Sequence, residues 1–169
     1  KLQAEFDGGA TLIQCALSAI PDDKLAQVVV VTQYPQVAEL ARKYGFTALP
    51  NPHPEVGQSE SIRIGLQALQ DCDEVLFQVA DQPKLQKETV AELIDFAAAH
   101  PDRIVGLGHN GRRGNPCIFP ARFYPELMAL TGDHGGRSVI LAHEEELLLM
   151  DVPSDQLIDI DTPEQLEKL

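Results

Sequence analysis

Short apolar runs alternate along this chain with segments of helical spacing, and this alternation restricts the fold more than any other feature. Residues 28–31 are four consecutive valines, and residues 75–79 form a second apolar run, interrupted only by Gln78. Between the two, residues 34–44 carry apolar side chains at helical spacing and end at Gly45. Continuous apolar strands separated by helices are typical of a mostly parallel sheet with helices on both faces.

The same patterns assign most of the chain to regular elements. We predict helices at residues 11–19, 34–44, 59–70, 87–99, 120–130 and 137–143, and strands at residues 27–32, 46–49, 74–79, 104–107, 147–152 and 157–161. Four glycines between residues 106 and 114 predict a ribbon or mobile loop inserted at the mouth of the sheet. No repeat or linker divides the sequence, so we expect a single domain over residues 1–169.

Composition excludes several classes of protein. The formal net charge of −13 argues against nucleic-acid binding, which depends on Lys and Arg side chains that neutralise phosphates. No apolar run is long enough for a membrane span, and 44% hydrophobic content suits a soluble domain with a sizeable core. Three cysteines without a C-x-x-C pair predict free thiols and a reducing, cytoplasmic location.

Two acidic residues stand where predicted strands end. Asp81 follows the run at residues 75–79, and Asp161 ends the predicted strand at residues 157–161, where Asp159 shares its face. Ligands bind at the carboxyl ends of strands in open α/β sheets, and Mg²⁺ favours one or two carboxylates. Local structure offers an alternative: Asp81 before Gln82 and Pro83 can start a turn.

The residues after Asp161 also have a structural explanation. Thr162 can be a helix N-cap, with Pro163 at the first helical position and Gln165 completing a capping box. Capping accounts for Thr162 and Pro163 but leaves Asp161 available to point at a ligand. We therefore rank Asp161 above Asp159 as a metal ligand.

The loop at residues 51–63 joins a predicted strand to a predicted helix. Ser59 or Ser61 can cap the helix, which would be a purely structural role. Alternatively, backbone amides and Ser61 contact a nucleobase, while Gly57 permits close approach of the ligand.

Several familiar catalytic motifs are missing from the sequence. It contains no G-x-S-x-G around a serine, no Walker loop, no G-x-G-x-x-G opening a helix, and no H-E-x-x-H. The five histidines show no spacing suited to zinc. Hydrolase, P-loop and dinucleotide-dehydrogenase functions therefore lose support.

Five motifs together resemble the MobA-like NTP transferase family, and most closely its MocA-like molybdenum cofactor cytidylyltransferase branch. They are VADQP at residues 79–83, NPHPEVGQSESIRIGL at 51–66, GRRGNPCIFP at 111–120, GDHGGR at 132–137 and DIDTPEQL at 159–166. The resemblance implies a Rossmann-like three-layer nucleotidyltransferase fold. It also implies Mg²⁺-dependent transfer of CMP from CTP to a phosphorylated molybdopterin, with release of pyrophosphate and a molybdoenzyme as client.

The resemblance assigns roles to particular residues. It implies catalytic roles for Lys1, Asp81 and Asp161, metal ligation by Asp81 and Asp161, nucleotide binding by Gly57, Gln58 and Ser61, and acceptor binding by Gly114, Asn115, Pro116, Asp133, Gly135 and Arg137.

One departure from the family pattern leaves alternatives open. The family opens with a strand and a glycine-rich phosphate-binding loop, whereas this sequence begins at Lys1-Leu2, and we expect that a preceding segment has been omitted. Guanylyl transfer from GTP and nucleotidyl transfer to a sugar phosphate use the same fold. A non-catalytic protein that delivers molybdenum cofactor is the alternative from another class, and the absent loop favours it, whereas both aspartates favour an enzyme.

Overall fold

A four-stranded sheet forms the centre of the larger part of the molecule. The structure is a computed structural model that describes residues 5–6, 9–162 and 165. The strand order is β5 (Glu74–Phe77), β7 (Arg112–Pro120), β6 (Ile104–His109) and β8 (Leu147–Asp151). Because β7 is antiparallel to β5 and β6, whereas β8 is parallel to β6, three of the four strands run in one direction.

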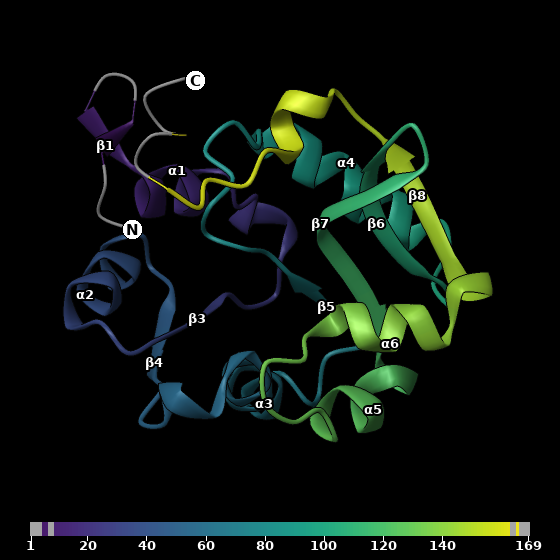
Figure 1. The fold of residues 1–169 in the computed structure, drawn as a ribbon, viewed down its shortest axis with the longest axis horizontal. Helices are drawn as coiled ribbons and strands as arrows, with labels where there is room; N and C mark the ends of the chain where they lie inside the picture. The colour runs from purple at the N-terminus through teal and green to yellow at the C-terminus, as the bar shows by residue number, and fades with distance from the viewer. Residues whose placement is uncertain (1–4, 7–8, 163–164, 166–169) are drawn as a thin grey trace.

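Helices cover both faces of this sheet, as Figure 1 shows. On one face lie α3 (Gln58–Ala68), α5 (Tyr124–Met128) and α6 (Gly136–Ala142), and on the other lies α4 (Lys87–Ala98). Successive side chains of a strand point to opposite faces, so β7 contributes to the hydrophobic core on each face of the sheet. Phe119 packs on the face covered by α3, α5 and α6, and its neighbour Ile118 packs on the face covered by α4. The expected three-layer α/β arrangement is therefore confirmed.

A second, two-stranded parallel sheet lies beside the first. It consists of β3 (Val29–Thr32) and β4 (Thr47–Pro50), connected by α2 (Pro35–Lys43). On one side it packs against α1 (Leu12–Ser18) and α2, with Ile13, Leu17, Val37, Ala41 and Phe46 as the buried residues. On the other side it meets α3. The short antiparallel pair of β1 (Glu5–Phe6) and β2 (Ala10–Thr11) precedes α1.

Turns of 3₁₀ helix link several of these elements. They are η2 (Asp22–Lys24), η3 (Pro54–Val56), η4 (Ala121–Phe123), η5 (Glu144–Glu146) and η6 (Ser154–Leu157). The predicted helix at residues 120–130 is thus divided into η4 and the short α5. Among the described residues, no helix is both long and apolar enough to cross a membrane. All three cysteines carry free thiols, as predicted.

Two sequence expectations need correction. The glycine-rich ribbon is a hairpin of β6 and β7, and the inner half of β7 is a central, buried strand of the main sheet. Its outer half, from Arg112 to Pro116, extends past the end of β5 and is the only ribbon-like part. The predicted strand at residues 157–161 is not formed, because this segment pairs with no neighbouring strand in the described chain.

Candidate active site

Asp81 lies beyond the carboxyl end of β5, in a loop that is tied to the C-terminal segment. Its carbonyl oxygen accepts a hydrogen bond of 2.9 Å from the backbone N–H of Ile160. The Ile160 side chain is only 2% exposed, whereas Asp159 and Asp161 on either side of it are exposed. A single buried residue thus fixes the backbone next to Asp81 and leaves the neighbouring carboxylates at the surface.

The segment around Asp161 is ordered by a cap and by Ile160, not by strand pairing. Thr162 Oγ1 accepts from Gln165 N at 3.4 Å, and Gln165 Oε1 accepts from Thr162 N at 3.0 Å. Gln165 Oε1 also accepts from Asp161 N at 2.6 Å. The predicted capping box is therefore confirmed. The argument that Asp159 and Asp161 share a face of a strand fails, because no strand is present there.

The hydrogen bond from Ile160 brings together the backbone segments that carry Asp81 and Asp161, and it does not build a complete metal cage from protein ligands. Within residues 5–6, 9–162 and 165, no cluster of three or more His, Cys, Asp or Glu side chains could hold a metal ion. Mg²⁺ usually needs only one or two carboxylates, because water and substrate phosphates fill the remaining positions. Gln82, which sequence reasoning missed, is 3% exposed beside Asp81, and its buried Oε1 has no hydrogen-bond partner.

The loop before α3 is built around Asn51, a second residue that was not singled out. Asn51 is 7% exposed, and its Nδ2 donates to Ser61 Oγ at 3.0 Å. Its Oδ1 accepts from His53 N at 2.9 Å, so one buried amide fixes both the loop and Ser61. A buried polar group requires hydrogen-bond partners, but the burial of Asn51 appears only in the folded chain, so no local sequence pattern marked it.

The first turn of α3 docks onto the loop before α6. Ser59 N donates to Gly132 O at 3.1 Å, and Gln58 N donates to Asp133 Oδ1 at 3.2 Å. Gly57 has φ of +102°, and a Cβ there would stand 2.6 Å from Gly132 O, so only glycine fits. A Cβ on Gly135 would overlap Gln58 Oε1. The amides of Gln58 and Ser59 belong to the loop whose backbone amides were one candidate contact for a nucleobase, and both already donate to the loop before α6.

Beside these contacts, Glu60 and Arg63 form an ion pair within α3. Arg63 Nε donates to Glu60 Oε2 at 3.0 Å, and Nη2 donates to Oε1. The hydrogen bond from the Arg63 guanidinium lowers the pKa of the Glu60 carboxyl from its usual 4.5. The pair keeps a charged, hydrogen-bonded carboxylate in the turn that presents Ser61.

The residues of β7 that the resemblance assigns to acceptor binding lie on an outer arm, from Arg112 to Pro116. Gly114 is packed against Leu157, since a Cβ at Gly114 would come within 3.0 Å of the Leu157 methyl carbons. Asn115 is half-buried and Pro116 is fully buried. Leu157 ends η6 and leads directly into the segment that carries Asp161. This arm is therefore linked by packing to the carboxylate segment.

The structure thus gathers the predicted residues into two groups. Ile160 and Leu157 connect the first group, which consists of Asp81, Asp161 and the Gly114 arm. The docked loop connects the second group, which consists of Gly57, Gln58, Ser61, Asp133 and Gly135. Arg137 is exposed on α6, close in sequence to that loop. In Figure 1 the yellow C-terminal segment and the loop between α5 and α6 lie apart. Lys1 lies outside the described residues.

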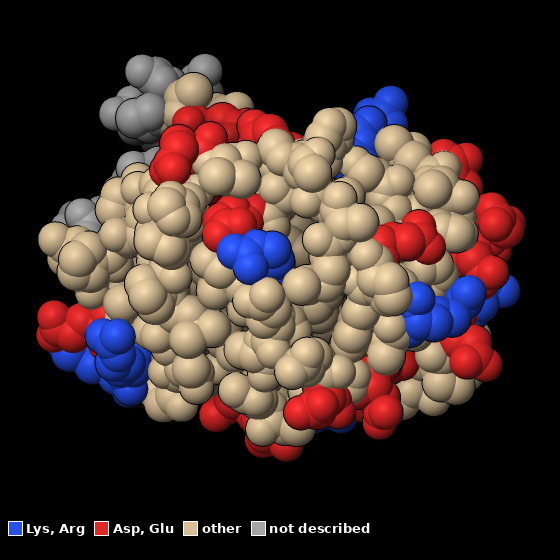
Figure 2. Space-filling view, turned by 90° about the horizontal axis from the view of Figure 1, so that it is seen from below, with Lys and Arg blue, Asp and Glu red and all other residues tan. Residues whose placement is uncertain are grey.

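The surface agrees with the strongly acidic composition. On the face shown in Figure 2, basic side chains form small separate groups among acidic ones, without a continuous basic surface. An anionic ligand on this face would therefore be bound by a few local cations, a metal ion or backbone amides.

Comparison with known proteins places this architecture in a family. The family model for the MobA-like NTP transferase domain matches residues 1–147, and no curated protein matched the sequence. The fold is similar to that of CMP:2-keto-3-deoxy-manno-octonic acid synthetase complexed with CTP, with a TM-score of 0.73 and 14% identity. That match covers 99% of this chain and 89% of the other.

Two further structures share the fold. Molybdopterin-guanine dinucleotide biosynthesis protein A from Archaeoglobus fulgidus has a TM-score of 0.65 and 18% identity, over 99% of this chain and 87% of the other. Rv0371C from Mycobacterium tuberculosis H37Rv, in complex with manganese, has a TM-score of 0.70 and 18% identity, over 99% of this chain and 89% of the other. At these identities the structural likeness establishes the fold, and the family match over most of the sequence establishes that the chain belongs to the MobA-like NTP transferase domain family.

Proposed function

We propose that this chain transfers CMP from CTP to a phosphorylated molybdopterin acceptor and releases pyrophosphate. The observation that carries the proposal is the hydrogen bond from Ile160 N to Asp81 O, which holds two acidic segments together beyond β5. Family membership supports nucleotidyl transfer, and the similar structures include one complexed with CTP and one named for molybdopterin-guanine dinucleotide biosynthesis.

Asp81 and Asp161 are the residues we assign to a divalent metal, Mg²⁺ in the proposed reaction. The donor set fits, because both are hard carboxylates on segments joined by a backbone hydrogen bond. The buried, unpartnered Gln82 Oε1 beside Asp81 is a further oxygen that could satisfy a water bound to the metal. When bound, the metal would neutralise charge on the nucleotide phosphates. The similar Rv0371C structure contains manganese, which agrees with a divalent ion.

The reaction requires no protein nucleophile. An oxygen of the acceptor's terminal phosphate forms a bond to the α-phosphorus of CTP, and the bond from that phosphorus to the bridging oxygen breaks. The electron pair leaves with pyrophosphate. The protein's contribution is positioning and charge neutralisation, which is the usual requirement of phosphoryl-type transfer.

Ser61, Gly57 and Gln58 form the nucleotide side of the proposed site. Asn51 fixes the Ser61 hydroxyl, and the α3 amides are held by the loop at residues 131–136. The resemblance assigned Asp133 and Gly135 to the acceptor. In our proposal these two residues instead position the first turn of α3. Arg137, Gly114, Asn115 and Pro116 remain on the acceptor side, and Lys1 remains the proposed phosphate contact.

Guanylyl transfer is the second candidate, because the A. fulgidus protein is named for a guanine dinucleotide. Transfer to a sugar acid or sugar phosphate is a variant of the same chemistry, supported by the likeness to an octonic acid synthetase. A delivery protein that hands cofactor to a client molybdoenzyme would need neither Asp81 nor a nucleotide.

The test is pyrophosphate release from CTP and GTP in parallel, with Mg²⁺ and a molybdopterin acceptor. Asp81→Ala is the site variant, and Asp95→Ala, an exposed aspartate of α4, is the matched control. We expect release with CTP that Asp81→Ala abolishes and Asp95→Ala leaves unchanged. Faster release with GTP would replace the proposal with guanylyl transfer. No release from the folded protein, with cofactor delivery intact in Asp81→Ala, would support the delivery role.

A further inference from the structure

Arg113 is a half-buried cation on the outer arm of β7. The structure describes two other half-buried arginines, Arg63 and Arg103, and these pair with Glu60 and Glu146 respectively. In the part of the chain that the structure describes, the Arg113 guanidinium forms neither a hydrogen bond nor an ion pair. Withdrawing a charge from water is costly unless an opposite charge compensates it. In a protein with a net charge of −13, an arginine without a carboxylate beside it points to an anionic ligand.

Strand register places the Arg113 side chain on the face of the sheet that carries α3, α5 and α6. Arg113 lies directly opposite Gly108 of β6, and opposite residues of an antiparallel pair share a face. Gly108 alternates along β6 with Ile104, which belongs to the core under these helices. Burial raises the pKa of the Cys117 thiol in the same core, and the Arg113 charge offsets part of this rise, which agrees with the placement.

Along the strand, Arg113 lies at the end of the sheet where the proposed metal ligands are. The last residue pair between β5 and β7 is Phe77 with Cys117. Asp81 follows Phe77 by four residues and Arg113 precedes Cys117 by four, and the antiparallel pairing carries both segments past the same end of the sheet. Four strand residues span roughly 13 Å, so Asp81 and Arg113 both lie within that distance of the last pair.

The outer arm of β7 also separates the two groups of site residues. Gly114 faces the C-terminal segment, because a Cβ there would come within 3.0 Å of the Leu157 methyl carbons. Its neighbour Arg113 points to the opposite face. The start of α6 lies on that opposite face, since a Cβ at Gly136 would stand 3.0 Å from Phe119 Cζ of the same strand. Arg113 is therefore on the side of the arm that carries the docked loop and the first turn of α3.

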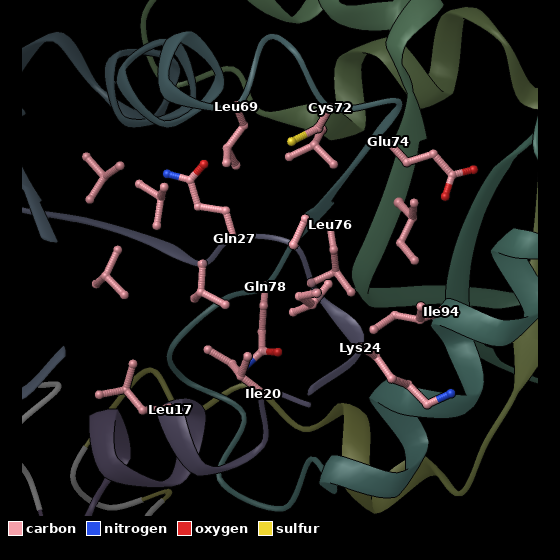
Figure 3. A pocket seen from close by; sticks show the side chains of 18 of the residues that line it. Leu17, Ile20, Lys24, Gln27, Leu69, Cys72, Glu74, Leu76, Gln78 and Ile94 are labelled. Atoms are coloured by element: carbon pink, nitrogen blue, oxygen red, sulfur yellow. The ribbon is translucent and has the colours of Figure 1, made fainter. Parts of the chain in front are cut away.

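The cavity between β3 and β5 offers no comparable cation. This cavity has a volume of about 880 Å³, and Figure 3 shows the side chains that line it. Its charged lining, among the described residues, consists of Lys24 and the three carboxylates Asp71, Asp73 and Glu74. Lys24 Nζ already pairs with Asp95 at 2.6 Å. A phosphate is therefore better neutralised at Arg113 than in this cavity.

We propose that Arg113 binds the terminal phosphate of the acceptor and holds it beside the α-phosphorus of CTP, an assignment that rests on the proposed nucleotidyl transfer. A guanidinium presents parallel N–H donors that match two phosphate oxygens, and it stays charged at any pH that proteins tolerate. The acceptor phosphate and the triphosphate are both anions, so a cation at the acceptor phosphate lowers the repulsion that opposes attack. Arg113 supplies the positive charge that its neighbours Gly114, Asn115 and Pro116 lack.

Steady-state kinetics of pyrophosphate release compares three variants of the intact protein. Arg113→Met removes the charge but keeps a long side chain, and Arg113→Lys keeps a charge but loses the forked donor. Arg112→Met is the matched control, because Arg112 is the exposed neighbour on the opposite face. We expect Arg113→Met to raise the KM for the phosphorylated acceptor about 10- to 100-fold and to change the KM for CTP by less than about twofold. Arg113→Lys should be intermediate, and Arg112→Met should resemble the wild type.

A binding measurement separates the role of Arg113 from the reaction itself. Titration calorimetry, without nucleotide or metal, compares the phosphorylated acceptor with its dephosphorylated form on wild-type protein and on Arg113→Met. The phosphate should strengthen binding to the wild type about tenfold or more, and this gain should vanish in Arg113→Met. Circular dichroism and urea denaturation check the fold. We expect no loss of stability, because Arg113 forms no ion pair with the described residues.

Three outcomes would overturn this role of Arg113. A raised KM for CTP with an unchanged KM for the acceptor would assign the guanidinium to the nucleotide phosphates. Equal losses in Arg113→Met and Arg112→Met would show that only the overall charge of the arm matters. The same gain from the phosphate in both proteins, or no gain in either, would show that the guanidinium does not contact it. By contrast, a gain confined to a wild-type protein that releases no pyrophosphate would retain the role of Arg113 and reject the proposed transfer.

Discussion

The backbone N–H of Ile160 donates to the carbonyl of Asp81 across 2.9 Å, and this bond links two segments that are 79 residues apart. The link depends on burial of the Ile160 side chain, because no strand pairing holds residues 158–161. The position of the proposed carboxylate pair therefore depends on the packing of the Ile160 side chain.

Replacing Ile160 by Ala should weaken metal binding without removing a ligand. Truncation of a buried isoleucine typically costs about 2 to 5 kcal/mol of stability. Loss of support behind metal ligands typically costs about 10- to 100-fold in affinity, so we expect a rise of that order in the Mn²⁺ dissociation constant. Titration calorimetry on the folded variant measures this dissociation constant.

Ile158→Ala is the matched control, because Ile158 is 40% exposed and only two residues away. It should leave both stability and Mn²⁺ affinity nearly unchanged. Wild-type affinity in folded Ile160→Ala would show that Asp161 does not depend on this anchor.

Gly57 should be far less tolerant of substitution than other glycines with positive φ. Gly57→Ala meets both an unfavourable φ of +102° and a backbone carbonyl 2.6 Å from the new methyl group. We expect a loss of about 3 kcal/mol in the free energy of unfolding, measured by urea denaturation. Gly45→Ala, with φ of +83° and no atom within 4 Å, should lose only about 1 kcal/mol. Equal losses would show that the contact with Gly132 relaxes freely.

The spacing of apolar residues was sufficient to predict most helices and strands. A helix or strand that buries one face must repeat apolar residues at a fixed interval, and this interval is visible in the sequence. The prediction failed at residues 157–161, where alternation of apolar and acidic residues suggested a strand but only Ile160 is buried there. It also failed to place β7 within the main sheet. Gly108 looked like a sign of looseness, yet a Cβ there would stand 3.0 Å from both Leu149 and Arg112 O, so this glycine permits tight packing.

For the candidate site, the sequence supplied candidate residues but could not predict their contacts. The pairing of Gln58 N with Asp133 Oδ1 spans 75 residues, and no local pattern encodes a contact of that range. The resemblance assigned Asp133 to the acceptor side, and the structure adds that its carboxylate accepts a hydrogen bond from an α3 amide. Asn51 and Gln82 were missed because their importance lies in burial, which appears only in the folded chain.

The Glu60 and Arg63 pair should contribute to stability in a pH-dependent way. Because Arg63 lowers the pKa of Glu60 in the folded state, the unfolded chain binds this proton more readily. The contribution is therefore present above the unfolded pKa of about 4.5, and it is lost as the pH falls through the lower folded pKa. Glu60→Gln and Arg63→Met should both flatten the free energy of unfolding against pH in this acidic range.

Urea denaturation at a series of acidic pH values measures this slope. Some slope should persist in both variants, since Lys87 lowers the pKa of Asp22 in the same direction. A wild-type slope in Glu60→Gln would show that the ion pair does not couple to folding.

Cys117 should resist thiol reagents in the native protein, even though its thiol is free. Burial in the core raises the pKa of Cys117 to about 11, and the charge of Arg113 offsets this only in part. At pH 8 only about 0.1% of such a thiol is ionised, and the thiolate is the reactive form.

We expect a disulfide reagent at pH 8 to modify the half-buried Cys72 well before Cys117, and to modify all three cysteines at similar rates in urea. Peptide mapping by mass spectrometry assigns the sites. Rapid native modification of Cys117 would show that the inner half of β7 opens locally, which would contradict its central position between β5 and β6.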